Sequence, residues 1–280
     1  MASVLRIRLS VPGSKVIGEM TGLLPVAFPD CHRCGHLAAG PARLCVACAR
    51  PQLDLVGPDA CPVCGQRLRV TGLCPNELCR SPRRRIGRIH AIAYQTGPLR
   101  RAINGYKYRG IRDWSVIFGR LLLGWLDETM ARDPPDLIVA NPSFVGPGGQ
   151  RFAHTEAVLE AAAAAAADAQ RRFDTTTPRA VIKTAATLKS ADAQAWSKRA
   201  IGYELRAALQ VTELARTAGK FVLVYDDVCT TGGQLDAVAA CLLDRGGAAR
   251  VEGIVLARAP WRGPAPPSLA RPDMRADHCR

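Results

Sequence analysis

Aromatic residues are scarce in this chain, at 5% of its 280 residues, while alanine is abundant and forms the run Ala161 to Ala167. This composition favours helices packed on a sheet over an all-β sandwich. Long apolar segments are missing too, since no run approaches the roughly 18 apolar residues of a membrane-spanning helix. Arg6, Arg8 and Lys15 interrupt the apolar residues at the N-terminus, and no signal-peptide cleavage site follows. We therefore expect a soluble, cytoplasmic protein with no membrane insertion.

Acidic residues are outnumbered, because 38 Lys and Arg face 24 Asp and Glu and give a formal net charge of +14. The imbalance is strongest between Arg80 and Arg120, where eleven basic residues accompany a single acid, Asp113. Such a stretch attracts polyanions, either nucleic acid or a phosphorylated small molecule. A solvated basic face is the other interpretation, and the sequence leaves both open.

Eight of the eleven cysteines form four pairs near the N-terminus, with the spacing C-x2-C-x10-C-x2-C followed by C-x2-C-x9-C-x4-C. Two cysteines three positions apart in a tight turn can place both thiolates on one tetrahedral metal ion. The simplest assignment is sequential, with one structural zinc ion for each set of four, although a cross-braced arrangement also fits the spacing. The first set is Cys31, Cys34, Cys45 and Cys48, and the second is Cys61, Cys64, Cys74 and Cys79.

Three other interpretations of the cysteines compete with zinc. Disulfides are disfavoured because nothing in the sequence is secretory. An iron–sulfur cluster needs four thiolates as well, but paired x2 spacings fit zinc better. The pairs could also bind no metal, which applies more to the irregular second set. Against that, a segment of about 50 residues with few large apolar side chains could hardly fold without a metal.

After the last cysteine, short apolar runs alternate with segments of helical spacing, which indicates an α/β fold with a mostly parallel sheet flanked by helices. We expect an N-terminal segment (1–28), a cysteine-rich zinc-ribbon module (29–81), an α/β domain (86–258) and a disordered basic tail (259–280). The expected strands are 89–94, 137–140, 181–182, 221–225 and 251–256, and the expected helices are 99–106, 114–130, 155–172, 197–214 and 235–244.

The segment after the clearest strand, Phe221 to Tyr225, has the residue types that a sugar phosphate needs. Ligands of parallel sheets bind beyond the carboxyl ends of the strands, where Asp226 and Asp227 offer carboxylates to a vicinal diol. The residues that follow can hold a phosphate with backbone N–H groups and hydroxyls at a helix N-terminus. These candidate phosphate-binding residues are Val228, Cys229, Thr230, Thr231, Gly232, Gly233 and Gln234.

An apolar strand followed by Asp-Asp-Val-x-Thr-Thr-Gly resembles the signature with which type I phosphoribosyltransferases bind 5-phosphoribosyl 1-pyrophosphate (PRPP). The order of a cysteine module, Tyr106-Lys107-Tyr108-Arg109-Gly110, a strand ending in Asn141-Pro142 and the Asp-Asp loop is similar to the ComF/GntX family. Members are phosphoribosyltransferase-like proteins linked to DNA uptake in competence. The resemblance covers most of residues 22 to 258. The chain departs from the family pattern at Cys229, at Gln234 and at residues 151–155.

The resemblance implies a protein that binds PRPP with Mg²⁺ and displaces pyrophosphate from the anomeric carbon of the ribose. Asp226 and Asp227 would be the catalytic pair that holds the ribose. The candidate pyrophosphate site consists of Asn141, Pro142 and Ser143, with Lys107 and Arg151 as charge partners. On the residues alone, Asp227 could instead cap a turn, and Lys107 could belong to a solvated helix face. His154 is expected to be an exposed helix residue.

Two function classes follow for this chain. The first is an enzyme that transfers phosphoribose to an unidentified acceptor, which the intact diol-and-phosphate loop favours. The second is a non-catalytic adaptor that senses PRPP or a nucleotide, or binds single-stranded DNA as a partner of the competence machinery. Zinc ribbons and the basic stretch favour nucleic acid. Sparse aromatics oppose a base-stacking platform, although Tyr94, Tyr106, Tyr108 and Trp114 cluster in the basic stretch.

Overall fold

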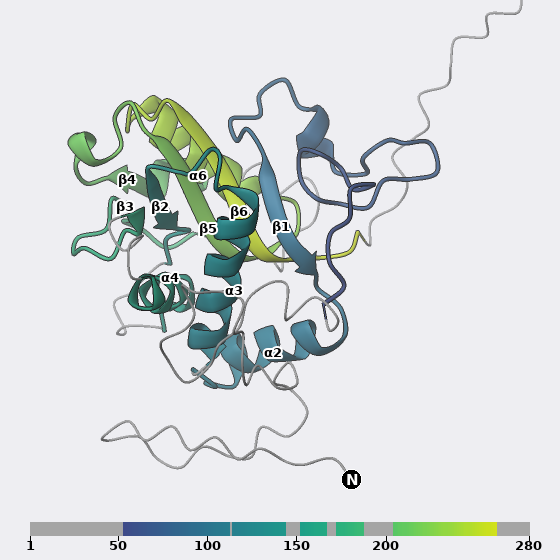
Figure 1. The fold of residues 1–280 in the computed structure, drawn as a ribbon. Helices are drawn as coiled ribbons and strands as arrows, with labels where there is room; N and C mark the ends of the chain where they lie inside the picture. Colours follow the sequence, from purple (N-terminus) through teal and green to yellow (C-terminus); the bar gives the residue numbers. More distant parts are fainter. Residues whose placement is uncertain (1–52, 113, 144–151, 167–171, 188–203, 262–280) are drawn as a thin grey trace, which may run out of the picture.

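The computed structural model describes residues 53–112, 114–143, 152–166, 172–187 and 204–261. Four parallel strands form the main sheet of this part of the chain, in the order β1-β6-β5-β2 (Figure 1). Helices lie on both faces of the sheet, so the predicted α/β fold with a mostly parallel sheet is confirmed. The strands are β1 (Ile89–Tyr94), β2 (Leu137–Ala140), β5 (Phe221–Cys229) and β6 (Arg250–Arg258).

The strand β5 lies inside the sheet, between β6 and β2. Its residues Val222 to Tyr225 are fully buried, because both faces of the sheet are covered. Side chains alternate along the strand, so Leu223 and Tyr225 pack into one core, whereas Val222 and Val224 pack into the other. β5 continues beyond the predicted run to Cys229, and Asp226 and Asp227 are therefore part of the strand near its carboxyl end.

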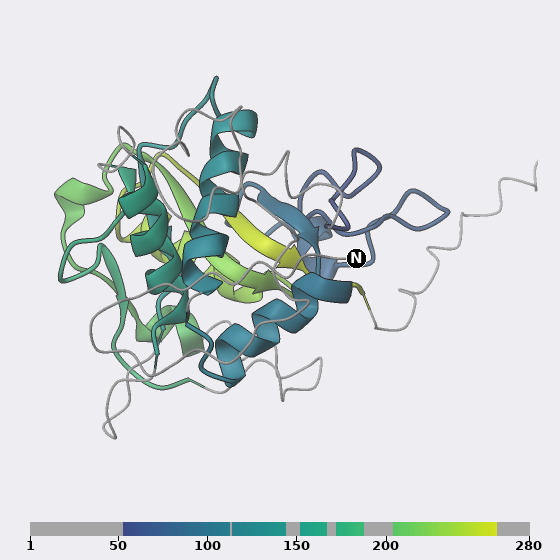
Figure 2. The ribbon, with the colours of Figure 1, turned by 60° about the horizontal axis from the view of Figure 1, so that its bottom comes forward.

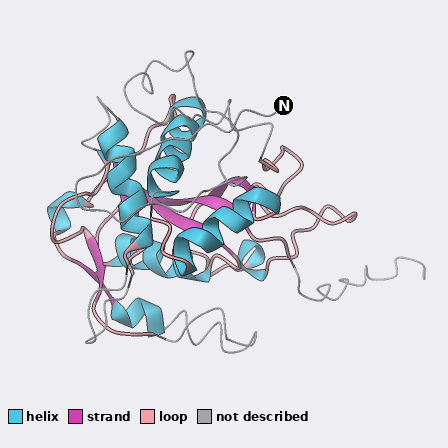
Figure 3. Cartoon of the chain, turned by 90° about the horizontal axis from the view of Figure 1, so that it is seen from below, coloured by secondary structure: helices cyan, strands magenta, loops and turns pink. Residues whose placement is uncertain are grey.

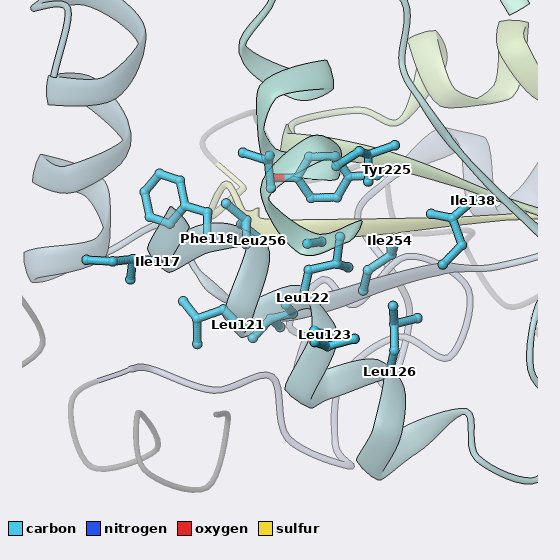
Figure 4. Close-up of a cluster of buried hydrophobic side chains, with 14 of the residues drawn as sticks. Ile117, Phe118, Leu121, Leu122, Leu123, Leu126, Ile138, Tyr225, Ile254 and Leu256 are labelled. Carbon is cyan, nitrogen blue, oxygen red and sulfur yellow. The ribbon is translucent and has the colours of Figure 1, made fainter. Parts of the chain in front are cut away.

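One face of the sheet is covered by α2 (Gly97–Tyr108), α3 (Trp114–Thr129) and α4 (His154–Ala165), which come forward in Figure 2. Leucines of α3 meet the strand residues Ile138, Ile254 and Leu256 in this core (Figure 4). The helices α3 and α4 approach closely at Gly119, where an added Cβ would lie 2.7 Å from the backbone nitrogen of Ala162. This packing fixes the start of α4 beside the carboxyl ends of β2 and β5.

The other face is covered by α6 (Gly233–Asp244) and by a two-stranded antiparallel sheet of β3 (Val181–Lys183) and β4 (Leu209–Val211). Figure 3 shows the parallel strands enclosed between the helices of the two faces. The second hydrophobic core includes Cys61, Cys64 and Cys74 of the cysteine-rich module, together with residues of α6 and β1. The described part of the cysteine-rich module therefore shares a core with the α/β domain.

The segment 53–81 packs along β1. Leu55 forms an antiparallel bridge with Ala93, and the N–H of Ile89 donates to the carbonyl of Val63 at 2.7 Å. A short 3-10 helix, η3 (Glu77–Arg80), closes the segment, and the Asn76 side chain caps it by accepting from the N–H of Leu78. These contacts place η3 next to the loop that follows β5.

Three predictions about elements are corrected by the structure. The second half of the predicted helix 197–214 is β4 followed by the 3-10 helix η6 (Leu214–Arg216). Helix-favouring Leu, Ala and Arg suggested a helix there, but pairing of Leu209–Val211 with β3 decides the local structure. β3 belongs to this separate antiparallel pair and not to the main sheet. The predicted helix 155–172 begins at His154 and ends at Ala165.

Several predicted features lie outside the described residues. They are the segment 1–28, Cys31, Cys34, Cys45, Cys48, Arg151 and the tail from residue 262. Within the described residues, none of the helices combines the length and the apolar character needed to cross a lipid bilayer.

Candidate functional site

A group of polar side chains meets at the carboxyl ends of β5 and β2. Asp226 and Asp227 come from β5, Asn141 follows β2, Lys107 comes from the last turn of α2, and His154 starts α4. Both aspartates are buried, with Asp227 only 1% exposed. Burying a carboxylate is costly unless charges and hydrogen bonds compensate it. The partners of each carboxylate therefore show how this site is stabilised.

Asp227 lies between two basic side chains from different helices. Lys107 Nζ donates to Asp227 Oδ1 at 2.9 Å. His154 Nε2 lies 3.3 Å from Asp227 Oδ2, but this buried oxygen has no hydrogen-bond donor in the described part of the chain. The pKa of Lys107 is raised: burial opposes this, but the attraction of Asp227 and Asp226 outweighs it. Asp227 thus has one buried acceptor atom without a hydrogen bond in the described part of the chain.

Asp226 is held by hydrogen bonds to neutral groups. Asn141 Nδ2 donates to Asp226 Oδ2 at 2.8 Å, and the N–H of Asp227 donates to Asp226 Oδ1 at 2.8 Å. The same amide of Asn141 lies 3.4 Å from Gln234 Oε1, at the start of α6. Burial, followed by repulsion from Asp227, raises the pKa of Asp226 to about 7. Near neutral pH the two aspartates therefore share less than two full negative charges.

The segment after β2 is fixed by the first turn of α4. The N–H of Ser143 donates to Glu156 Oε1 at 3.1 Å, and the hydroxyl of Thr155 donates to the carbonyl of Asn141 at 3.0 Å. The N–H of Asn141 also donates to the carbonyl of Tyr225 in β5 at 2.7 Å. The predicted pyrophosphate residues Asn141, Pro142 and Ser143 therefore leave the sheet beside the two aspartates. Arg151, the other predicted partner, lies outside the described residues.

The loop between β5 and α6 is built for a close backbone approach. Gly232 has a φ of 82°, a left-handed conformation that favours glycine. An added Cβ there would also lie 3.0 Å from Leu78 Cδ2 of η3. Inside the described part of the chain, the N–H groups of Thr231 and Gly232 have no hydrogen-bond acceptor. Thr230 is exposed, Val228 and Gly233 are half-buried, and Cys229 is buried.

No family model and no curated protein sequence matches this chain.

A second polar cluster lies on the other side of the same loop. The sulfur atoms of Cys61, Cys64, Cys74 and Cys79 all lie within 4.8 Å of one another. The separations are 3.8 Å from Cys61 to Cys79 and 3.7 Å from Cys74 to both Cys64 and Cys79. Four sulfurs at about 2.3 Å from a zinc ion form a tetrahedron with edges of about 3.8 Å. These four cysteines could therefore bind a zinc ion, in the grouping that the sequential assignment predicts.

Ionisation of the four thiols also favours a metal. Hydrogen bonds from Cys74 and Cys79 lower the pKa of Cys64 well below its ordinary value. The hydrogen bond to Cys64 raises the pKa of Cys74 to about 12, and Cys64 also raises the pKa of Cys79. Among Cys64, Cys74 and Cys79, only one thiolate is therefore favoured without further positive charge. A divalent cation with a preference for sulfur would allow all four to ionise.

The sequence did not indicate several residues of the two clusters. His154 was expected to be an exposed helix residue, but its side chain is 27% exposed and faces Asp227. Thr155 and Glu156 carried no motif, although they hold the segment after β2. Lys107, by contrast, was a predicted charge partner, and its ammonium group lies 2.9 Å from Asp227 Oδ1. Of the four clustered aromatics, Tyr94, Tyr106 and Trp114 are buried in the core and only Tyr108 is exposed.

Proposed function

We propose that the carboxyl end of β5 binds PRPP or another ribose 5-phosphate compound, and that the chain transfers the phosphoribosyl group to an acceptor. One observation carries most of the support. Asp227 Oδ2 lacks a hydrogen-bond donor, while the N–H groups of Thr231 and Gly232 lack acceptors among the described residues. A ribose 5-phosphate has hydroxyl donors at one end and phosphate acceptors at the other, so one ligand would satisfy both groups.

Each side chain of the site has a role in this proposal. Asp226 and Asp227 would accept hydrogen bonds from the two ribose hydroxyls. The Thr230 hydroxyl and the N–H groups of Thr231 and Gly232 would hold the 5-phosphate at the start of α6. Val228, Cys229, Gly233 and Gln234 would shape the loop around it. The side chain of Lys107 is 22% exposed, whereas the side chain of Asp227 is buried, so an incoming ligand can reach the lysine from the solvent side.

In the proposed transfer, a nitrogen of the acceptor forms a bond to the anomeric carbon while the bond from that carbon to the pyrophosphate oxygen breaks. The pyrophosphate leaves with the electron pair of the broken bond, and the acceptor nitrogen releases its proton to water. Lys107 and the segment Asn141 to Ser143 would orient the leaving group next to the aspartates. Mg²⁺ bound to the pyrophosphate would neutralise its charge.

A non-catalytic adaptor that senses a nucleotide or binds single-stranded DNA is the second candidate. It is favoured by exposed basic residues beside the cysteine cluster, namely Arg80, Arg83, Arg85 and Arg88. Burial of Tyr94, Tyr106 and Trp114 removes three rings that base stacking would need. Release of pyrophosphate in the presence of an acceptor would support the enzyme. DNA affinity that falls steeply with salt would support the adaptor.

The proposal is tested by calorimetric titration of the zinc-loaded chain with Mg-PRPP. We expect saturable binding by the wild type and no measurable binding by the double variant Asp226→Asn with Asp227→Asn. Asp244→Asn is the matched control, because Asp244 is an exposed aspartate of α6 that pairs with Arg85 away from the loop. An absence of heat with a folded wild type would reject the proposed ligand class, and equal binding by the double variant would reject the proposed site.

A further inference from the structure

Arg258, at the end of β6, lies between the cysteine cluster and the loop that follows β5. Its side chain is fully buried. Arg258 Nη1 donates to the carbonyl of Cys229 at 2.7 Å, to Cys229 Sγ at 3.1 Å and to the carbonyl of Thr230. Arg258 Nη2 donates to Cys64 Sγ at 3.6 Å. One guanidinium group therefore contacts a metal-binding thiol and the backbone of the ligand loop.

The charge of Arg258 needs a counter-charge, because a buried unpaired guanidinium is strongly unfavourable. No carboxylate of the described residues forms an ion pair with Arg258. Four thiolates on one Zn²⁺ carry a net charge of −2, which would supply that counter-charge through Cys64. The burial of Arg258 is thus explained best by an occupied metal centre.

Asn76 forms a second connection between the two features. It lies between Cys74 and Cys79 in sequence, and its N–H donates to Cys74 Sγ at 3.4 Å. Its side-chain Nδ2 donates to the carbonyl of Thr231 at 3.0 Å. The next turn of the module places Leu78 against Gly232. The carbonyls of Cys229, Thr230 and Thr231 are therefore all held by side chains that also contact the cysteine cluster or its turn.

We infer that the Cys61–Cys79 metal centre sets the conformation of the ligand loop through Arg258 and Asn76, with Arg258 as the positioning residue. When the loop carbonyls are held from the module side, the N–H groups of Thr231 and Gly232 remain directed away from those contacts and available to a phosphate. The metal centre would thereby control phosphate binding without touching the ligand. The phosphate part of this inference rests on the proposed function, whereas the control of loop conformation does not.

The inference is tested by amide hydrogen exchange of the full zinc-loaded chain without ligand. We expect Arg258→Met to raise exchange in residues 229–236 by about tenfold or more, since charge-assisted hydrogen bonds to two carbonyls are lost. Exchange in α3 should not change, and Arg258→Lys should restore part of the protection. Arg250→Met is the matched control, because Arg250 lies on the same strand and pairs with Asp133 away from the loop. Unchanged exchange at 229–236 in Arg258→Met would overturn the inference.

Two further measurements keep the test decisive. If Arg258→Met does not fold, Asn76→Ala and removal of zinc from the wild type take its place, and each should raise exchange in the same residues before α3 responds.

Mg-PRPP titrations separate this inference from the proposed function. A wild type that fails to bind PRPP rejects the function and leaves the exchange result intact. If the wild type binds PRPP and Arg258→Met binds it with equal affinity, the inference that the metal centre controls phosphate binding is overturned.

Discussion

The loop from Cys229 to Gly232 has a carboxylate cluster on one side and a thiol cluster on the other, and the two are stabilised differently. The carboxylate cluster draws its partners from four separate elements, including Lys107 of α2 and His154 of α4. The thiol cluster comes from one short segment, Cys61 to Cys79, and contacts the buried cation Arg258. In the carboxylate cluster, the side chains of Lys107 and His154 lie beside Asp227 and can compensate its negative charge. In the thiol cluster, the one positive charge of Arg258 does not compensate four thiolates.

This difference separates an exchangeable site from a permanent one. The side chain of Lys107 lies on the solvent side of Asp227, so a ligand bound at Asp227 would displace it. Four clustered thiolates, three of them on buried cysteines, would need a metal that stays in place. We therefore expect changes to the thiol cluster to affect folding and changes to the carboxylate cluster to affect binding. The following predictions test that division, starting with the largest expected effect.

Replacing a cysteine of the thiol cluster should have the largest effect on stability. Cys64→Ser should reduce the bound zinc by one ion per chain and destabilise the fold by more than about 5 kcal/mol, because structural zinc binding is coupled to folding. Metal analysis and thermal unfolding measure both effects. Cys241→Ser is the control, since Cys241 is a buried cysteine of α6 outside the cluster. Equal zinc content in Cys64→Ser and the wild type would contradict the assignment.

Removing the cation of the carboxylate cluster should have an intermediate effect. Lys107→Met leaves the buried carboxylate of Asp227 without its ion pair and should cost about 2–4 kcal/mol, less than for a fully buried pair because Lys107 is partly exposed. The double variant Lys107→Met with Asp227→Asn should recover much of that loss. Urea unfolding of the four proteins measures the coupling. Additive effects of the two substitutions would show that the pair does not stabilise the site.

Neutralising Asp226 should have the smallest effect, and its sign should depend on pH. The pKa of Asp226 is raised to about 7 in the folded chain, so its contribution to stability is present at pH 4 and lost as the pH rises through 7. Asp226→Asn should therefore stabilise the ligand-free protein by about 1–2 kcal/mol at pH 8 and by less at pH 5. Asn141 can rotate its amide to accept from the new side chain. Thermal unfolding at both pH values checks this, and a loss of stability at pH 8 would contradict it.

Much of the sheet could be predicted because its strands are short, apolar and bounded by polar residues. The strands 89–94 and 137–140 have the predicted bounds. The four residues 137–140 are buried and all apolar, as burial on both faces requires, whereas 89–94 includes the half-buried His90. β4 could not be predicted, because its three residues form a strand only by pairing with β3. Local spacing favoured the observed grouping of Cys61, Cys64, Cys74 and Cys79, although a cross-braced arrangement also fitted that spacing. The contacts of His154 and Arg258 could not be predicted, because each of these residues contacts an element that is distant in the sequence.

We propose that the carboxyl end of β5 holds a ribose 5-phosphate between Asp227 and the loop Thr230 to Gly232. A crystal structure of the zinc-loaded chain with Mg-PRPP tests it most directly. We predict ribose hydroxyls on Asp226 and Asp227, the 5-phosphate on the N–H groups of Thr231 and Gly232, and Lys107 displaced from Asp227 Oδ1. PRPP bound instead on the exposed arginines between Arg80 and Arg88, with the Lys107 to Asp227 ion pair intact, would contradict the account.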